Sequence, residues 1–251
     1  MTADAPTILS CHGIAKRFGA FEVLDDCSMT LSQGEIVSVL GQSGSGKTTL
    51  FNILAGLDAP DRGEVMRGAR VGYMLQKDLL LPWKRLIDNI ALPLVLDGRS
   101  RDDARRHAAK HLTTFGLEGL ERRYPSQLSG GQRQRAALLR TYLYSRELML
   151  LDEPFSGLDA LTREQLYDWL LEHRSKLGLS ILLITHDIEE ALRLSDRIYV
   201  LSQGHPASLW PSLAVPRPAS LSEDEALLAT ARLRQTIRRR LFAVRPETVD
   251  V

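Results

Sequence analysis

The sequence predicts an α/β fold in which a mainly parallel sheet carries an inserted helical subdomain, and two observations support this. Short, nearly unbroken apolar runs of strand length recur along the chain and alternate with helical patterns, which is typical of strands covered by helices on both faces of a parallel sheet. Between Leu86 and Ser145 the strand-like runs stop and only helical patterns remain. We therefore expect an α/β core that is interrupted by helices.

Five apolar runs are expected to form strands of the core. They are EIVSVL at Glu35–Leu40, RVGYML at Arg70–Leu75, ELMLLD at Glu147–Asp152, SILLIT at Ser180–Thr185 and RIYVLS at Arg197–Ser202. Runs of this length, with aliphatic residues at most positions, indicate strands that are buried on both faces. The helical patterns between them complete the βαβ units of a parallel sheet.

The inserted region contains an amphipathic pattern over residues 100–116. Its apolar positions, spaced by four, four and three residues, are Ala104, Ala108, Leu112 and Phe115. This spacing predicts a helix with one buried face, with Ser100 as its N-cap and Gly116 at its end.

Two further helices are expected after the insertion. LTREQLYDWLLEHR begins with a possible capping box between Thr162 and Gln165, followed by a buried face at Leu166, Trp169 and Leu170. Near the C-terminus, SLSEDEALLATARLRQTIRRRLF predicts one helix capped by Ser222 and Glu225. Its apolar stripe, which we expect to pack on the body, is Ala226, Leu233, Ile237 and Leu241. The predicted domains are a core over 1–85 and 146–204, a helical lobe over 86–145 and a short extension over 205–251.

Composition excludes several classes of protein. Lys and Arg total 32 against 31 Asp and Glu, so no global charge would attract nucleic acid, and we expect no direct nucleic-acid partner. The two cysteines, Cys11 and Cys27, are too few for a disulfide framework and lack metal-ligand spacing. The N-terminus has no basic region followed by an apolar one, so we expect no secretion signal. No apolar run approaches the roughly 18 residues of a membrane helix.

The stretch GQSGSGKT at Gly41–Thr48 matches the phosphate-binding pattern G-x-x-x-x-G-K-[ST], between a predicted strand and a predicted helix. Glycines allow successive backbone N–H groups to point at phosphate oxygens, and the start of the helix favours anions. Lys47 would reach the β- and γ-phosphates, and Thr48 would offer its hydroxyl to Mg²⁺. A glycine-rich turn without a ligand would leave Lys47 unexplained.

Two carboxylates, Asp152 and Glu153, end the predicted strand of LMLLDEP. Ligands of open α/β sheets bind at the carboxyl ends of the strands. Asp152 could therefore hold Mg²⁺ through water, and Glu153 could polarise the attacking water as a general base. The alternative is an N-cap pair for the following turn, which Pro154 makes possible.

Together these motifs resemble the nucleotide-binding subunit of an ABC transporter over nearly the whole chain. The phosphate loop, LSGGQ at Leu128–Gln132, LLDEP, SGLD at Ser156–Asp159 and THD at Thr185–Asp187 follow one another in the order of that family. The resemblance implies a P-loop NTPase core with a mainly parallel sheet, an N-terminal antiparallel β subdomain and an inserted helical subdomain. It also explains why a second glycine- and serine-rich helix start, LSGGQ, is present: two copies face each other head to tail.

The resemblance implies a role for each matching residue. Ser129 and Gly131 would contact, from one copy, the γ-phosphate of the ATP held by the other. The implied nucleotide-binding residues are Phe18, Gly41, Ser43, Gly44, Ser45, Gly46, Lys47, Thr48, Thr49, Ser129, Gly130, Gly131, Gln132 and Asp159. The implied catalytic residues are Glu153, His186 and Gln76, and those at the Mg²⁺ ion are Thr48, Gln76 and Asp152.

Some of these residues have plain structural interpretations as well. On its residue type alone Phe18 is a core or loop aromatic, although its place before the phosphate loop favours stacking on adenine. His186 follows an apolar strand and could be a core histidine, yet the THD context favours a contact with the γ-phosphate. Asp159 could cap a helix, contact the other subunit, or do both. The run Arg238–Arg240 is most simply a solvated helix face, with attraction to anionic lipid or a permease as the alternative.

The stretch LLLPWKRLIDNIALPL, which follows Gln76, is similar to the nitrate, sulfonate and taurine subgroup of ABC importers. Trp83 and the surrounding apolar residues could form a groove for a helix of another protein, or could be ordinary lobe core. The solute itself is chosen by other chains, so the sequence does not name it.

The sequence therefore predicts an ATP-hydrolysing motor subunit of an ABC importer, with ATP and Mg²⁺ as cofactors. The expected partners are integral-membrane permease subunits, a second ATP-binding subunit and, indirectly, a solute-binding protein. The expected location is the cytoplasmic face of the inner membrane, where the chain would be peripheral. The alternatives are a soluble ABC ATPase that acts on ribosomes or nucleic acid, a catalytically silent cassette, and the ATPase of an exporter.

Overall fold

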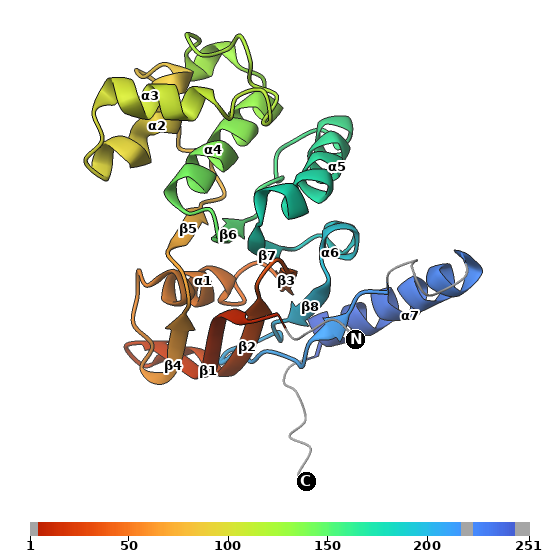
Figure 1. Cartoon of the computed structure of the whole chain (residues 1–251). Coiled ribbons are helices and arrows are strands. Elements are labelled where there is room, and N and C mark those ends of the chain that lie inside the picture. The colour runs from red at the N-terminus through yellow and green to blue at the C-terminus, as the bar shows by residue number, and fades with distance from the viewer. Residues whose placement is uncertain (1–4, 217–222, 244–251) are drawn as a thin grey trace. The chain divides into compact units, whose positions relative to one another are not determined.

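The computed structural model describes residues 5–216 and 223–243. The chain divides into two compact units (Figure 1), one formed by residues 1–70 and 179–251 and the other by residues 71–178. We call the first the P-loop unit, after the phosphate loop at Gly41–Thr48. We call the second the signature unit, after LSGGQ at Leu128–Gln132, which we name the signature loop. The boundaries predicted for the helical lobe, 86–145, stay a prediction, because the signature unit also includes two strands and a further helix.

The N-terminal part of the P-loop unit is an antiparallel sheet, which agrees with the β subdomain that the resemblance implied. Its strands, in the order β2-β1-β4, are β1 (Thr7–Phe18), β2 (Phe21–Ser32) and β4 (Arg62–Arg67). A two-residue turn joins β1 to β2, and Phe18 lies directly opposite Phe21 in the register. Two aromatic residues are thereby placed opposite each other at one end of the hairpin.

The P-loop unit also contains a set of mainly parallel and mainly buried strands. In the order β7-β3-β8-β9 they are β7 (Ser180–Thr185), β3 (Ile36–Leu40), β8 (Arg197–Val200) and β9 (Leu213–Ala214). β3 pairs in parallel with both β7 and β8, whereas the short β9 is antiparallel to β8. Every residue of β3 and β7 is buried, as their unbroken apolar runs predicted. Helices α1 (Lys47–Ala55) and α6 (Ile188–Leu194) follow β3 and β7.

The predicted C-terminal helix is α7, which spans Glu223–Leu241. Leu233, Ile237 and Leu241 are buried in one cluster with residues of β3, β8 and α6, so the stripe packs on the P-loop unit as expected. Ala226, one or two turns earlier, is only partly buried. Ser222, the expected cap, lies outside the described residues.

The signature unit combines two parallel strands with helices. The strands are β5 (Val71–Met74) and β6 (Leu148–Asp152), which pair in parallel. Its helices are α2 (Leu86–Leu96), α3 (Arg101–Ala109), the 3₁₀ turn η1 (Pro125–Gln127), α4 (Gly130–Tyr144) and α5 (Ala160–Leu177). The helical content of residues 86–145 agrees with the loss of strand patterns there.

Two predicted helix boundaries were wrong. The helix capped by Ser100 ends at Ala109 and not near Gly116, because hydrogen bonds between residues three apart replace the α pattern after it. The residues beyond that end, Leu112 and Phe115, remain buried nonetheless. The second wrong boundary is the start of α5, described next.

Helix α5 is capped by Asp159 and not by the box predicted between Thr162 and Gln165. The Asp159 carboxylate accepts from the Thr162 backbone N–H at 3.0 Å and from its hydroxyl at 2.6 Å. The cap consequently lies three residues before the predicted one, because a carboxylate competes well for the N–H groups of a first turn. The alternative reading of Asp159 as a cap is confirmed. These hydrogen bonds also lower the pKa of Asp159, which keeps it ionised.

Candidate functional site

The phosphate loop lies between β3 and α1 and surrounds the Lys47 ammonium. Lys47 is buried, and its Nζ donates to the Gly41 carbonyl at 2.8 Å and to the Gln42 carbonyl at 2.7 Å. The loop therefore curls around a fixed positive charge. An anion bound there would meet that charge and the N–H groups of the first turn of α1 together.

Glycines shape the loop at two positions. Gly46, the residue before α1, has φ +95°, and a Cβ on it would lie 3.0 Å from atoms of both Val23 and Leu24. At Gly41 a Cβ would lie 2.7 Å from the hydroxyl of Ser45. That hydroxyl is buried and has no hydrogen-bond partner among the described residues. An unsatisfied buried hydroxyl beside a buried ammonium fits a phosphate ligand, whose oxygens would satisfy it.

A hollow of about 370 Å³ opens beside the loop. This volume is within the range of small-molecule sites. The residues that line it are Phe18, Phe21, Val23, Gly44, Gly46, Lys47, Thr48, Thr49 and His205. The hollow thus brings the predicted adenine-stacking Phe18 to the phosphate loop. Phe18 and Phe21 are each 55% exposed.

The sequence did not predict three of these lining residues, namely Phe21, Val23 and His205. Phe21 could have been found from its place opposite Phe18 across a short turn. Nothing in the sequence pairs His205 with this loop, because it follows β8 in the last fifth of the chain.

The carboxylates Asp152 and Glu153 occupy the end of β6 in the signature unit. Asp152 is buried, and the Tyr73 hydroxyl donates to it at 3.5 Å. Burial and the neighbouring carboxylate of Asp152 raise the pKa of Tyr73, so this hydroxyl remains a donor. Glu153 has φ +45°, a conformation that non-glycine residues rarely adopt and that concentrates at functional sites.

Gln76, just beyond β5, is brought to Glu153. Its Nε2 donates to Glu153 Oε2 at 3.1 Å, although the two residues lie 77 positions apart. This hydrogen bond fixes the orientation of the carboxylate. Two residues that the sequence placed in the catalytic group therefore contact each other.

The signature loop forms a capping box at the start of α4. Ser129 Oγ accepts from the Gln132 N–H at 3.2 Å, and the Gln132 side chain accepts from the Ser129 N–H at 2.9 Å. A Cβ on Gly131 would lie 2.5 Å from Thr162 Cγ2 in α5, so only glycine fits there. Gly130 is less restricted, with 3.3 Å to Leu158.

His186 directly follows β7 in the P-loop unit and is exposed. The next residue, Asp187, caps α6 by accepting from the N–H groups of Glu189 and Glu190. His186 is therefore presented at the carboxyl end of a parallel strand, where ligands of such sheets bind. The core-histidine alternative does not fit this exposed position.

The predicted site residues are distributed over both units. The P-loop unit contains Phe18, the phosphate loop with Thr48 and Thr49, and His186. The signature unit contains Gln76, the signature loop at 128–132, Asp152, Glu153 and Asp159. Each half is internally organised as described above.

An apolar loop follows Gln76 in the signature unit. Its Trp83 is 72% exposed, and Leu79 is exposed as well, which contradicts the reading of Trp83 as ordinary core. The side chain of Asn89 is buried and braces the loop, accepting from Leu81 N–H at 2.7 Å and donating to the carbonyls of Leu81 and Lys84 at 3.1 Å. The loop that carries the exposed Trp83 is therefore held in place by hydrogen bonds from Asn89.

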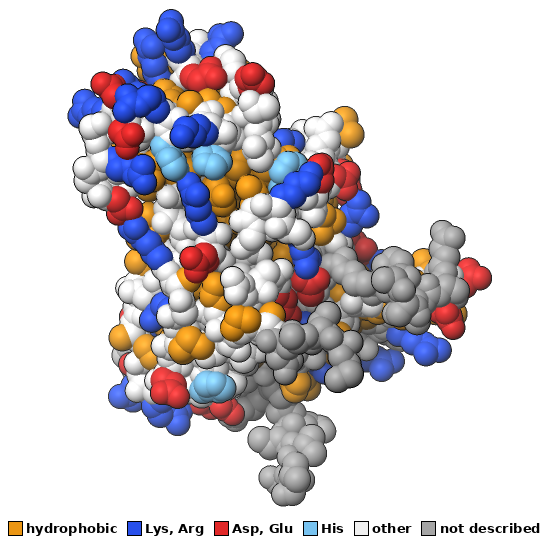
Figure 2. All heavy atoms as spheres, viewed as in Figure 1, with side chains coloured by type: hydrophobic (Ala, Val, Ile, Leu, Met, Phe, Trp, Pro, Cys, Tyr) orange, Lys and Arg blue, Asp and Glu red, His pale blue; other side chains and the backbone are white. Residues whose placement is uncertain are grey.

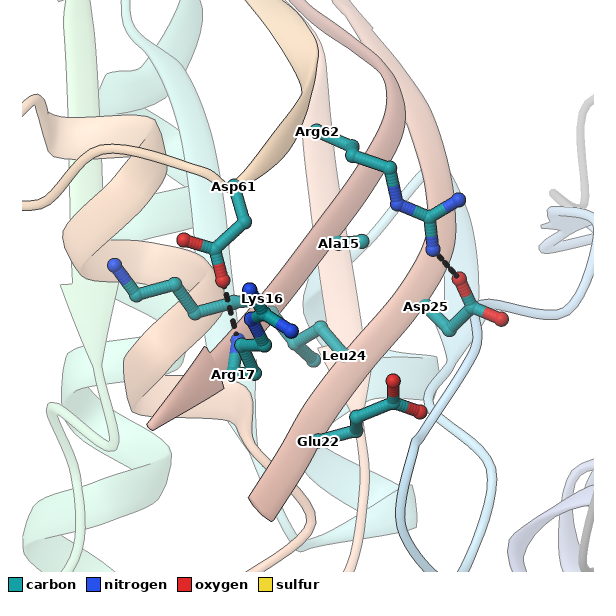
Figure 3. Close-up of a pocket in the computed structure, with 8 residues that line it drawn as sticks. All are labelled: Ala15, Lys16, Arg17, Glu22, Leu24, Asp25, Asp61 and Arg62. Carbon is teal, nitrogen blue, oxygen red and sulfur yellow. Dashed lines mark hydrogen bonds and ion pairs between the residues drawn. The ribbon is translucent and has the colours of Figure 1, made fainter. Parts of the chain in front are cut away.

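A second hollow, of about 320 Å³, lies on the antiparallel sheet (Figure 3). Its charges pair across the strands. Arg62 contacts Asp25 at 2.9 Å, and the Arg17 backbone N–H donates to Asp61 at 2.7 Å. Glu22 lies opposite Arg17 in the register. These contacts are those of a solvated sheet surface, so we do not assign this hollow to the site.

Comparison with known proteins agrees with this geometry. The family model of the ABC transporter matches residues 24–156. The chain is 47% identical over 182 residues to the formylaminopyrimidine import ATP-binding protein ThiZ of Halalkalibacterium halodurans, covering 72% of this chain and 73% of that one. It is 40% identical over 224 residues to the aliphatic sulfonates import ATP-binding protein SsuB 1 of Shouchella clausii, covering 88% of each.

Solved structures agree as well. The dimeric bacterial ABC transporter cassette MJ0796 has a TM-score of 0.71 at 28% identity and covers 83% of this chain and 99% of that one. The chain therefore belongs to the ABC transporter family and is one of its ATP-binding, ATP-hydrolysing cassettes, with the ABC ATPase fold. Among residues 5–216 and 223–243, no helix is both long and apolar enough to cross a membrane.

Proposed function

We propose that the chain is the ATP-hydrolysing motor of an importer, in which two ATP-binding subunits drive uptake through a separate permease. The observation that carries the proposal is the full set of site motifs in a chain whose relatives, over 72% and 88% of its length, are import ATP-binding proteins. These relatives belong to systems for formylaminopyrimidine and aliphatic sulfonates. We propose a small organic solute of this kind, including sulfonates and taurine, or nitrate.

The P-loop unit supplies the groups that bind the phosphates. Lys47 neutralises the β- and γ-phosphates, Ser45 donates its buried hydroxyl, and the first turn of α1 contributes backbone N–H groups. Thr48, Asp152 and Gln76 would hold Mg²⁺. When bound, this ion neutralises charge on the phosphates and orients them.

The signature unit supplies the base. Glu153 takes a proton from the attacking water, and the amide of Gln76, 3.1 Å from its carboxylate, aims it. His186 contacts the γ-phosphate. Gln76 also precedes the apolar loop, so the residue that orients the base is continuous with the proposed docking surface.

In this proposal the signature unit carries both the contacts with the second copy and the docking surface for the permease. Ser129 and Gly131 of one copy bind the γ-phosphate held by the other, and Asp159 lies at the junction of the two copies. The docking surface is formed by Leu79 and Trp83, and side chains of α4 contact the loop that carries them. Arg133 pairs with Asp78 at 3.2 Å, and Arg140 donates to the Asp78 carbonyl at 2.6 Å. Through these contacts, movement of the docked permease is transmitted to α4.

In this proposal the chain lies at the cytoplasmic face of the inner membrane, bound there through the permease. A solute-binding protein outside the membrane would select the cargo and act on this chain only through the permease. Of the three arginines at the end of α7, Arg238 and Arg239 are exposed and form a solvated helix face in this proposal. Arg240 is half-buried, stacks on Trp210 with 5.3 Å to its ring centroid, and donates to the Pro211 carbonyl at 2.6 Å.

The test combines catalysis with transport. Glu153→Gln should lower kcat for ATP about 100-fold or more and should preserve an ATP-bound dimer, detected by light scattering after size-exclusion chromatography. Glu147→Gln, an exposed carboxylate near the other end of β6, is the matched control and should keep wild-type turnover. Hydrolysis by Glu153→Gln near the wild-type rate would contradict the assignment of the base.

The transport part uses tagged chain purified from detergent-solubilised membranes of its host. Mass spectrometry should identify a multi-spanning permease, and Trp83→Ala should weaken its recovery while leaving ATPase activity of the isolated chain unchanged. Ribosomal or DNA-repair partners in place of a permease would contradict the import function and leave the ATPase chemistry in place.

A further inference from the structure

The hollow beside the phosphate loop has an aromatic rim that comes from two distant segments. We propose that His205 and Phe21, together with Phe18, bind the base of the nucleotide, and that His205 is a base-binding residue of this cassette. The inference rests on the proposed nucleotide site and specifies how that site holds the base.

The segment around His205 is fixed to β2 by backbone pairing. Ala207 forms a parallel bridge with Leu24, its N–H donates to the Val23 carbonyl at 3.0 Å, and its carbonyl accepts from the Asp25 N–H at 2.9 Å. In a parallel register, residues two positions earlier on each chain are neighbours. His205 is therefore placed beside the start of β2.

The rings of His205 and Phe21 are in contact there. Their centroids are 4.7 Å apart with an angle of 57° between the planes, a normal geometry for an aromatic pair. Both residues line the hollow, and both are exposed. The pair thus presents a ring surface to the hollow, and His205 adds ring nitrogens that can donate or accept a hydrogen bond.

Strand β2 in turn packs against the phosphate loop. Val23 and Leu24 lie so close to Gly46 that a Cβ there would be 3.0 Å from each. The Phe21–His205 pair is therefore held at a fixed place relative to the loop that grips phosphate. A ligand with a phosphate chain at one end and a planar ring at the other matches both parts of the hollow.

Phe18 completes the rim from the opposite strand. The Lys16 ammonium lies 5.3 Å from its ring centroid and is held by the Asp58 carboxylate at 2.8 Å and the Ala59 carbonyl at 2.7 Å. Phe18 and Phe21 remain more than half exposed despite their apolar rings. A nucleobase fits this rim because it has apolar faces to stack on the rings and a polar edge for His205.

The experiment separates base binding from phosphate binding. Wild type, Phe21→Ala and His205→Ala are titrated by calorimetry with ATP and, separately, with inorganic tripolyphosphate. His12→Ala, which replaces an exposed histidine of the same sheet outside the hollow, is the matched control. We expect the Kd for ATP to rise about three- to tenfold in His205→Ala and at least about fivefold in Phe21→Ala. The Kd for tripolyphosphate should not change.

A double variant tests whether the two rings act together, because the combined loss should be smaller than the product of the single losses. An ATP affinity of His205→Ala within 1.5-fold (about 0.2 kcal/mol) of wild type, or an equal loss for ATP and tripolyphosphate, would overturn the inference. Failure of the wild-type chain to bind ATP would instead contradict the proposed function. Unchanged tripolyphosphate binding also verifies that each variant is folded.

Discussion

The phosphate loop before α1 and the signature loop before α4 are both rich in glycine and serine, yet their helices begin in opposite ways. Helix α1 follows Gly46, which provides no side-chain cap. Helix α4 follows Ser129, whose side chain forms a reciprocal capping box with Gln132. The first start leaves N–H groups open to a ligand, whereas the second is partly closed by its own residues.

This difference teaches that similar composition need not mean the same kind of site. The phosphate loop also holds a buried cation, Lys47, and the signature loop holds none among its five residues. The first is built to bind phosphate by itself. The second offers a capped, rigid helix start to a phosphate held elsewhere, which agrees with its proposed role across the dimer.

The largest effect should come from removing the buried cation. Lys47→Ala should raise the Kd for ATP about 100-fold, because charge-assisted bonds to phosphate are lost in a buried site. Lys176→Ala, which removes an exposed partner of Glu172, is the control and should bind ATP normally. Calorimetry measures both. A Kd for Lys47→Ala within twofold of wild type would mean that the loop does not grip phosphate as we describe.

The next effect concerns the signature loop. Gly131→Ala should lower the free energy of unfolding by about 1–3 kcal/mol, because its Cβ would overlap Thr162 Cγ2. The isolated chain should still bind ATP with wild-type affinity, since one copy holds the nucleotide through its own phosphate loop.

Thr162→Ser in the same chain provides the matched rescue. It removes Cγ2 and keeps the hydroxyl that bonds Asp159, so urea unfolding should return toward the wild-type midpoint. Absence of rescue would show that the overlap is not the cause of the instability.

A smaller effect should follow from opening the capping box. Ser129→Ala should cost about 1 kcal/mol of stability, the usual value of an N-cap side chain, and should lower ATPase activity without changing ATP binding by the single chain. Ser126→Ala, an exposed serine three residues earlier, serves as the control. Chemical denaturation followed by circular dichroism measures the stabilities. Equal unfolding midpoints for the two variants would argue against the box.

The smallest effect is a loss of stability at low pH that we expect in the signature unit. In the signature unit, where basic side chains gather over α2 and α3 (Figure 2), His107 Nε2 lies 2.7 Å from Arg146 Nη2. Burial and then Arg146 lower the pKa of both His107 and His111, with Lys110 adding to the effect. Of the charged groups acting on His107, Arg99 also lowers its pKa and Asp103 raises it.

Because these pKa values are lower in the folded chain than in the unfolded one, the unfolded state binds protons first as the pH falls. Stability of the signature unit should therefore be constant above about pH 7 and decrease as the pH falls below the ordinary histidine pKa of about 6.5. Hydrogen exchange at pH 7.5 and 5.5 should detect earlier opening of α3 at the lower pH. In His107→Asn the difference should shrink, and an unchanged difference would assign the effect to other groups.

Much of the fold was predictable because it depends on neighbouring residues. The five apolar runs became β3, β5, β6, β7 and β8, since unbroken aliphatic stretches of that length favour buried strands. The cap at Ser100 was also correct, because capping is local chemistry. The end of α3 and the start of α5 were wrong, because two kinds of local bond competed there and the sequence did not rank them.

The sequence by itself determined the phosphate loop, the signature loop, the carboxylate pair and the family, since each is a short pattern whose chemistry is complete within a few residues. Only the tertiary structure decided that Gln76 meets Glu153 and that His205 meets Phe21 at the phosphate loop. The tertiary structure also decided that α7 packs against β3 and β8. The physical reason is that such contacts depend on the path of the whole chain and on strand register, which no periodicity within a short window contains.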